Sequence, residues 1–191
     1  MFGNMSGNMF GNNKNEEASL YYLYMMADGN VSHSEEKLFD SICKDLNLDD
    51  ESKKEVINKC KEMSRGSSDI FSVMVREKVD EKASNIGLFT NYSGLARIIW
   101  NLVNLGYADS KYSGGEKKFV KYLVDKWSIS PEVLQEFVDT ADTILALSKQ
   151  KEWIATTYVK GTVRDKKERE VDAQINEMLE YVKLTIKEIT M

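Results

Sequence analysis

The sequence contains few of the residues on which hydrolytic triads, zinc sites and disulfide frameworks depend. Its 191 residues include one histidine, two cysteines and one proline. A single histidine gives little support to a Ser-His-Asp or Cys-His triad, and the cysteines lack the spacing of a zinc site. Two such cysteines fit a reducing cytoplasm. The scarcity of proline favours a helical chain, because proline breaks helices from within.

Charge and hydropathy argue against further classes of protein. The net charge is −5 and no basic stripe stands out, so we expect no nucleic-acid partner. The sequence has no run of 18 apolar residues, so we expect no membrane span. A basic region followed by an apolar core is missing at the N-terminus, which argues against a secretory signal. We therefore expect a cytoplasmic protein.

What the chain does have is an internal repeat at a fixed offset of 81 residues. A repeat of this kind determines the architecture of a protein. The segment that begins at Ala27 matches the segment that begins at Ala108, and the register continues without a gap through the following helices. The matched positions include Asp28 and Asp109, Ser32 and Ser113, Glu35 and Glu116, Phe39 and Val120, Ile42 and Leu123, and Ile57 and Val138.

Apolar spacing predicts the same order of elements in both copies, namely a helix, a short turn and two further helices. In the first copy we expect helices over 15–27, over 34–46 and from about residue 49, followed by a connecting helix. A loop over 85–91 should lead into the second copy, with Ser93 as the N-cap of its first helix. The predicted fold is all-α, a pseudo-two-fold helical bundle of two helix-turn-helix-helix repeats.

The sequence divides into three regions. Residues 1–14 are rich in methionine, glycine and asparagine, and we expect a disordered low-complexity tail. Residues 15–150 should form the helical bundle. Residues 151–191 should form a C-terminal extension, with a short helix near Trp153 and then a long amphipathic helix. That helix either packs back on the bundle or pairs with a partner or a second copy. Its apolar stripe comprises Val171, Ile175, Leu179, Val182 and Ile186.

Two capping boxes begin at Ser32 and Ser113, where a serine is followed three residues later by a glutamate. Capping alone could be the main role of these residues. It does not explain Asp28 and Asp109, which lie near the ends of the preceding helices, where the macrodipole disfavours a carboxylate. Either these aspartates accept hydrogen bonds from turn amides, or a divalent cation bridges the aspartates and the glutamates.

The sequence letters around the first capping box resemble a known signature. Residues 25–36 read Met-Met-Ala-Asp-Gly-Asn-Val-Ser-His-Ser-Glu-Glu. This segment is similar to the Ala-Asp-Gly-x-(Val/Ile)-x-x-x-Glu signature of TerB-like domains, the family of the tellurite-resistance protein TerB. Residues 108–116 resemble a degenerate second signature. The resemblance covers about 20–147 and implies a compact all-α bundle.

The resemblance also implies an acidic cluster that binds a divalent cation. Carried over residue by residue, the metal ligands are Asp28, Glu35, Asp109 and Glu116. Ca²⁺ is the expected ion, because every ligand is an oxygen atom. Two residues depart from the signature, because Ser110 replaces the expected glycine and Lys111 adds a positive charge beside the second half-site.

These features lead to a leading hypothesis and two competitors. We expect a non-enzymatic module that binds a divalent cation and interacts with proteins in a stress response of the tellurite-resistance type. Its partner would be another protein, or a second copy bound through the C-terminal helix. The first competitor is a scaffold or oligomerisation domain without metal, in which the acids only cap helices. The second is a metal-dependent hydrolase, for which His33 and Glu36 are the only candidate bases.

Overall fold

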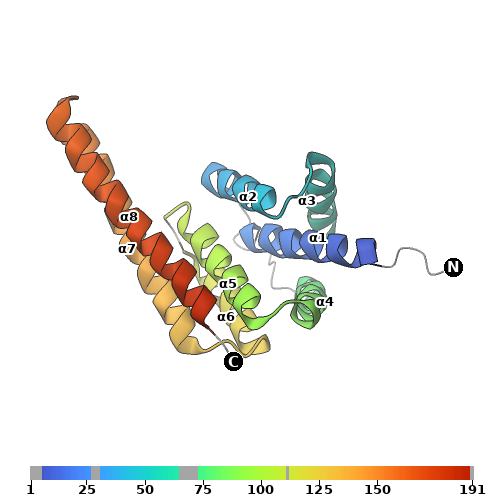
Figure 1. The fold of residues 1–191 in the computed structure, drawn as a ribbon. Helices are drawn as coiled ribbons and strands as arrows, with labels where there is room; N and C mark the ends of the chain where they lie inside the picture. The colour runs from blue at the N-terminus through green and yellow to red at the C-terminus, as the bar shows by residue number, and fades with distance from the viewer. Residues whose placement is uncertain (1–5, 27–30, 65–72, 111, 190–191) are drawn as a thin grey trace.

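The chain is helical throughout the part that the structure describes (Figure 1). The computed structural model describes residues 6–26, 31–64, 73–110 and 112–189, and these contain no strand. The predicted all-α class is therefore confirmed. The helices are α1 (Ser6–Met25), α2 (His33–Asp45), α3 (Asp50–Ser64), α4 (Val73–Phe89), α5 (Tyr92–Tyr107), α6 (Gly114–Lys126), α7 (Pro131–Thr157) and α8 (Thr162–Glu188).

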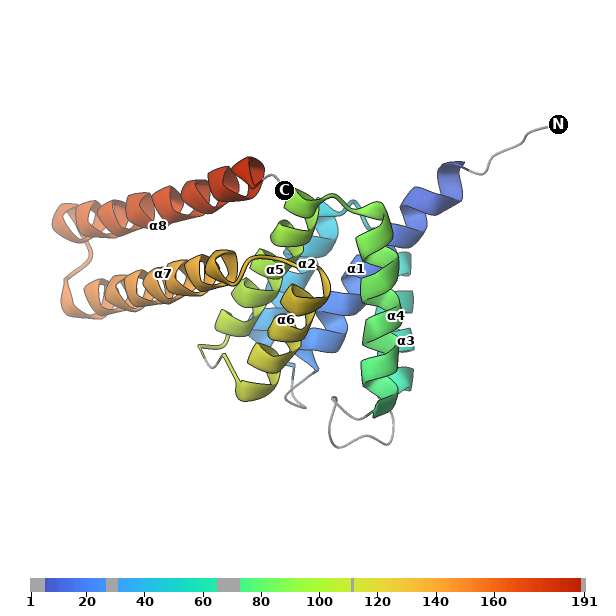
Figure 2. The same ribbon diagram turned by 90° about the horizontal axis from the view of Figure 1, so that it is seen from below.

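Helices α1 and α5, the first helices of the two copies, form the centre of the bundle (Figure 2). Every residue from Glu17 to Met25 is buried in α1. Helices α3 and α4 pack along α1, whereas α6, α7 and α8 pack along α5. Helix α2 contacts both α1 and α5, and α6 also contacts both. Tyr24 of α1 packs edge to face on Phe119 of α6, with ring centroids 5.4 Å apart. Both copies thus have the predicted order of elements, while their superposition about a two-fold axis stays a prediction.

The connection between the copies differs from the prediction. Helix α4 continues to Phe89, and Thr90 alone separates it from the N-cap of α5. That N-cap is Asn91, whose side-chain oxygen accepts a hydrogen bond from the amide of Gly94 at 2.9 Å. The predicted loop over 85–91 and the predicted cap at Ser93 are therefore wrong.

Packing explains why the helix continues through residues that favour loops. Ile86 is fully buried, so this turn of α4 contributes to the core. A Cβ atom on Gly87 would lie 3.3 Å from Nε1 of Trp127, and the indole N–H donates to the carbonyl of Ala83 at 2.9 Å. Glycine at this position therefore makes room for Trp127, the C-cap residue of α6, rather than ending the helix.

Helix α1 begins at Ser6 and includes residues from the segment 1–14, for which a disordered tail was expected. Glycine and asparagine have low helix propensity, and the first tertiary contacts described along α1 are at Asn13 and Glu16. The side-chain amide of Asn13 donates to the Thr90 hydroxyl at 3.4 Å, and Lys82 pairs with Glu16 at 2.7 Å. Residues 1–5 lie outside the described part of the chain.

Helices α7 and α8 form a long antiparallel hairpin that projects from the bundle (Figures 1 and 2). Helix α7 runs unbroken to Thr157, so the expected boundary at residue 150 falls inside a helix. Helix α8 returns along α7 and also contacts α5. Its predicted stripe faces inward, with Val171 and Val182 buried and the other three members half-buried. Across the described helices, no segment combines the length and apolar character of a bilayer-spanning helix.

Candidate functional site

Both predicted capping boxes are complete. The Ser32 hydroxyl accepts from the amide of Glu35 at 3.2 Å, and the Glu35 carboxylate accepts from the amide of Ser32 at 2.7 Å. In the second copy, the same pair of hydrogen bonds joins Ser113 and Glu116 at 3.3 and 2.6 Å. The two repeats therefore use one local structure to begin α2 and α6.

The two capping glutamates are buried, which capping itself does not require. Glu35 is 3% exposed and Glu116 is 5% exposed, although each stands in the first turn of its helix. Burying an ionised carboxylate is costly unless hydrogen bonds or opposite charges compensate it. In each glutamate, one oxygen, Oε2, accepts the serine amide. The repeat thus places two carboxylates inside the protein at equivalent positions.

Both carboxylates lie near the hydroxyl of Tyr24, in the last turn of α1. Burial raises the pKa of Tyr24 well above its usual value, and the charges of Glu116, Tyr112 and Glu35, in that order, together with a side-chain hydrogen bond with Glu116, raise it further. The hydroxyl is fully enclosed, and among the carboxylates it interacts most strongly with that of Glu116. Two buried acids, one in the first turn of α2 and one in the first turn of α6, therefore influence the same enclosed phenol of α1.

Gly106, in the last turn of α5, also lies against the Tyr24 hydroxyl. A Cβ atom on Gly106 would lie 2.3 Å from the Tyr24 hydroxyl oxygen and 2.5 Å from the ring of Tyr112. Only glycine leaves space here for both aromatic side chains. Burial also raises the pKa of Tyr112, with the charges of Tyr107 and Glu116 as smaller causes. We call the group formed by Tyr24, Glu35, Gly106, Tyr112 and Glu116 the inter-repeat site.

The two aspartates of the predicted cluster are placed less fully. Asp109 is half-buried in the turn after α5, and Asp28 lies outside the described residues. Where side chains are described, no group of three or more acidic, histidine or cysteine residues gathers closely enough to hold a metal ion. The structure thus buries Glu35 and Glu116 at equivalent positions, where both raise the pKa of Tyr24, and leaves the four-acid cluster a prediction.

Ser110 shows why the signature has glycine at its position. Its φ is 67°, in the left-handed region that glycine adopts without a steric penalty. A serine there costs on the order of 1 kcal/mol. The turn nevertheless forms, with the Ser110 amide donating to the carbonyl of Tyr107 at 3.1 Å. Lys111 lies outside the described residues.

The remaining candidates are an exposed histidine and two buried cysteines. The side chain of His33 is 78% exposed, and its nearest charged partner is Glu36 at 3.8 Å. Cys43 and Cys60 are buried and free, and burial raises the pKa of each thiol to about 11. Such thiols remain protonated at neutral pH and react slowly.

A buried polar network between α1 and α5 was not predicted. The carboxylate of Glu17 pairs with the guanidinium of Arg97 through two contacts, at 2.8 and 2.9 Å, and accepts from the Tyr21 hydroxyl at 2.7 Å. Asn101 donates to the same hydroxyl at 3.0 Å. In sequence, these residues form only two pairs with helical i, i+4 spacing, 80 residues apart. The sequence did not single out Tyr24 as a site residue either, because an aromatic residue in an apolar helix is usually part of the core.

A comparison with protein families agrees with this architecture. The family described as "Tellurite resistance protein TerB" matches residues 15–137, from α1 into the first part of α7. The chain belongs to the TerB family. The TerB match includes both capping boxes and the inter-repeat site, and ends before the projecting half of the hairpin. Comparisons with curated proteins and with solved structures gave no match.

Proposed function

We propose that this TerB-family protein is a non-enzymatic, cytoplasmic module that binds a divalent cation and interacts with proteins in a stress response of the tellurite-resistance type. The observation that carries the proposal is the burial of Glu35 and Glu116 beside the enclosed Tyr24 hydroxyl. Two acids held at equivalent positions in a repeat would form the two halves of one site.

The chemistry of the donors favours a hard cation. The inter-repeat site offers carboxylate and phenol oxygens, and Ca²⁺ takes six to eight oxygen ligands. Glu35 and Glu116 would hold the ion from the starts of α2 and α6, with Asp28 and Asp109 supplying oxygens from the turns. A bound cation would neutralise the buried acids and would join the first copy to the second.

The alternative function is that of a scaffold without metal. The complete capping boxes favour it, because they assign each glutamate a structural role that needs no ion. The two proposals differ in what neutralising the glutamates would do. Glutamine preserves a capping box, because its carbonyl oxygen can still accept the serine amide, but it removes the negative charge that a cation requires.

Calorimetric titration of the whole protein with Ca²⁺ and with Mg²⁺ tests the proposal. We expect the wild-type protein to bind Ca²⁺ at one site, and the Glu35→Gln, Glu116→Gln protein to lose most of this binding. The matched control is Glu51→Gln, Glu132→Gln, which removes two exposed carboxylates at another pair of repeat-related positions. Unchanged binding in the first variant, or an equal loss in the control, would refute the inter-repeat cation site.

A further inference from the structure

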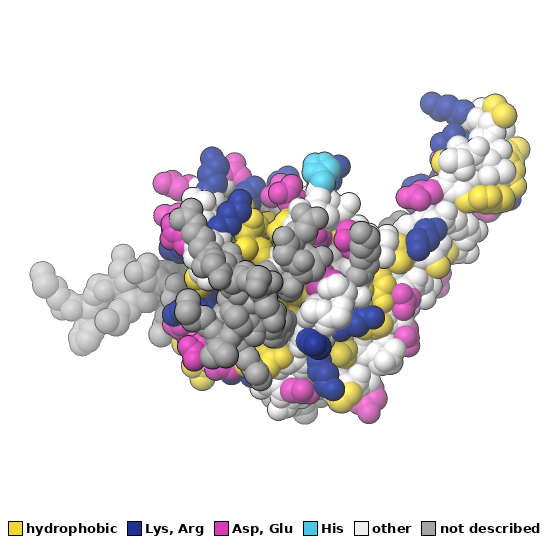
Figure 3. All heavy atoms as spheres, turned by 180° about the vertical axis from the view of Figure 1, so that it is seen from behind, with side chains coloured by type: hydrophobic (Ala, Val, Ile, Leu, Met, Phe, Trp, Pro, Cys, Tyr) yellow, Lys and Arg dark blue, Asp and Glu magenta, His cyan; other side chains and the backbone are white. Residues whose placement is uncertain are grey.

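The outer end of the α7–α8 hairpin exposes large apolar side chains. Trp153 is 56% exposed, Val159 is 91% exposed and Val163 is 60% exposed. In the space-filling view, hydrophobic and basic side chains gather at the end of this projection (Figure 3). We call residues 153–167 the hairpin tip.

The tip is basic in an acidic protein. Residues 153–167 carry Lys160, Arg164, Lys166 and Lys167 and one acid, Asp165, a net charge of +3, whereas the whole chain has −5. The next acids along α8, Glu168 and Glu170, pair with Arg164 and Lys166, so Lys160 and Lys167 supply most of the excess positive charge. Positive charge and exposed apolar side chains therefore occur together on a projecting element. This combination would suit an acidic, partly apolar surface.

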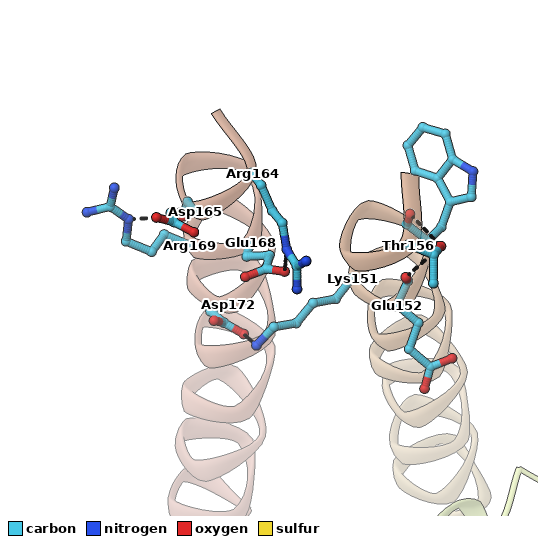
Figure 4. Close-up of polar contacts among 9 residues, drawn as sticks. Lys151, Glu152, Thr156, Arg164, Asp165, Glu168, Arg169 and Asp172 are labelled. Carbon is cyan, nitrogen blue, oxygen red and sulfur yellow. Dashed lines mark hydrogen bonds and ion pairs between the residues drawn. The ribbon is translucent and has the colours of Figure 1, made fainter. Parts of the chain in front are cut away.

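Contacts between and along the helices hold the tip in shape. Lys151 of α7 pairs with Asp172 of α8 at 2.5 Å, and Arg164 pairs with Glu168 at 2.8 Å (Figure 4). The ammonium of Lys167 lies over the Tyr158 ring, 5.3 Å from its centroid. A pre-formed surface loses less conformational entropy on binding than a flexible one.

A shallow, open groove of about 620 Å³ lies nearer the bundle, between the same two helices. Three acids line it, Glu132, Glu136 and Asp139, and its lining includes no lysine or arginine. Met178 and Tyr181 supply apolar surface, and Tyr181 is 51% exposed. The groove has the charge and the apolar character that the tip would require in a partner.

Helical periodicity places the tip and the groove on the same side of the hairpin. Trp153 follows Gln135 of the groove by 18 residues, and Tyr181 of the groove follows Val163 by 18 residues. Eighteen residues make about five turns of an α-helix, so each pair occupies one face, about 27 Å apart along its helix. A two-fold axis that passes between two such hairpins at mid-length would place the tip of each copy against the groove of the other.

We propose that the partner of the hairpin is a second copy of this chain, packed antiparallel so that each tip docks in the other copy's acidic groove. Such a contact is isologous and closes on itself, as in most homodimers. A face about 27 Å long and two helices wide buries on the order of 1,000 Å² in total, near the lower bound for a specific interface. The dimer deepens the interaction part of the proposed function and does not depend on the cation site.

Charge reversal with complementation tests this arrangement. Gln135→Lys, Asp139→Lys, Thr143→Lys changes the net charge of the groove lining from −3 to +1, and Lys160→Glu, Lys166→Glu changes that of the tip from +3 to −1. These exposed positions leave the Ser130 cap and the Arg164 ion pair intact, and Lys166→Glu removes only the exposed contact of Lys166 with Glu170 at 3.9 Å. Each variant alone would meet like charge at both contacts of its homodimer. A mixture of the two variants would restore opposite charge at both contacts. Lys37→Glu, Lys54→Glu is the control for charge reversal on other helices.

Sedimentation equilibrium of the full chain in EDTA, from about 1 µM to about 300 µM, measures association over the range expected of a weak interface. We expect the wild-type and control proteins to dimerise, each single variant to associate at least about tenfold more weakly, and the mixture to recover to within about threefold of wild type. Quenching of tryptophan fluorescence by acrylamide gives a second readout of dimer formation. Trp153 is the exposed tryptophan, and the dimer should protect it.

A monomeric wild-type protein, or variants that associate as the parent does, would overturn the proposal. The proposal would also be overturned if the mixture of the two variants associated as weakly as each variant alone. Binding of the monomeric parent to vesicles containing phosphatidylglycerol, lost in the tip variant, would instead assign the tip to an anionic membrane. Because every measurement is made in EDTA, a negative result leaves the calorimetric test of the cation site unaffected.

Discussion

Removal of Arg97 tests the buried ion pair that joins the two copies at the centre of the bundle. Glu17 is 6% exposed, and its carboxylate receives two guanidinium contacts and the Tyr21 hydroxyl. Arg97→Met would leave this carboxylate buried with one neutral donor. Breaking a buried pair costs about 3–5 kcal/mol. Since the Arg97 side chain is 41% exposed, solvent should reduce the loss to about 2–4 kcal/mol.

Urea unfolding followed by circular dichroism measures this loss as a lower midpoint with an unchanged slope. The double variant Glu17→Gln, Arg97→Met removes the uncompensated charge, so it should be more stable than Arg97→Met by more than about 1 kcal/mol. Lys59→Met, which removes one member of an exposed ion pair, should change stability by less than about 0.5 kcal/mol. If Arg97→Met costs no more than the Lys59 control, the central ion pair does not stabilise the fold.

Three further predictions concern the rest of the fold. Gly106→Ala should lower the unfolding free energy by about 1–3 kcal/mol in urea, because the new methyl group would meet the Tyr24 hydroxyl. Burial raises the pKa of Cys43 and Cys60 to about 11, so their contribution to stability is complete below about pH 8.5 and should be lost between about pH 8.5 and 11. Urea unfolding at pH 8 and 10.5 should show this decline, and a smaller one in the Cys43→Ala, Cys60→Ala protein. Deletion of 165–191 should cost several kcal/mol in the same assay, on the order of two to three buried aliphatic side chains, and unchanged stability would contradict the packing of α8.

Local rules were sufficient to predict the helix starts that bound the site. The capping boxes at Ser32 and Ser113, and the serine–proline start of α7, depend on residues within one helical turn of each other. Their hydrogen bonds formed as the sequence indicated. The apolar stripe of α8 was predictable for the same reason, because its period is a property of one helix.

Features that depend on distant residues were not predictable. Asn85 and Gly87 favour a loop by local propensity, but the burial of Ile86 and the approach of Trp127 keep α4 helical. The burial of Glu35 and Glu116 depends on how α2 and α6 pack against α1 and α5. Tyr24 belongs to the site only because Gly106, far along the chain, leaves room for its hydroxyl.

The cation site is the central claim, and the stability of the whole protein tests it most directly. Urea unfolding of the wild-type protein is measured in EDTA and in Ca²⁺ at about 100 times the calorimetric dissociation constant. A ligand that binds only the folded state at this concentration stabilises it by about 2.7 kcal/mol. We predict this gain for wild type and almost none for Glu35→Gln, Glu116→Gln. An equal response of the two proteins to Ca²⁺, or no response in wild type, would contradict the account.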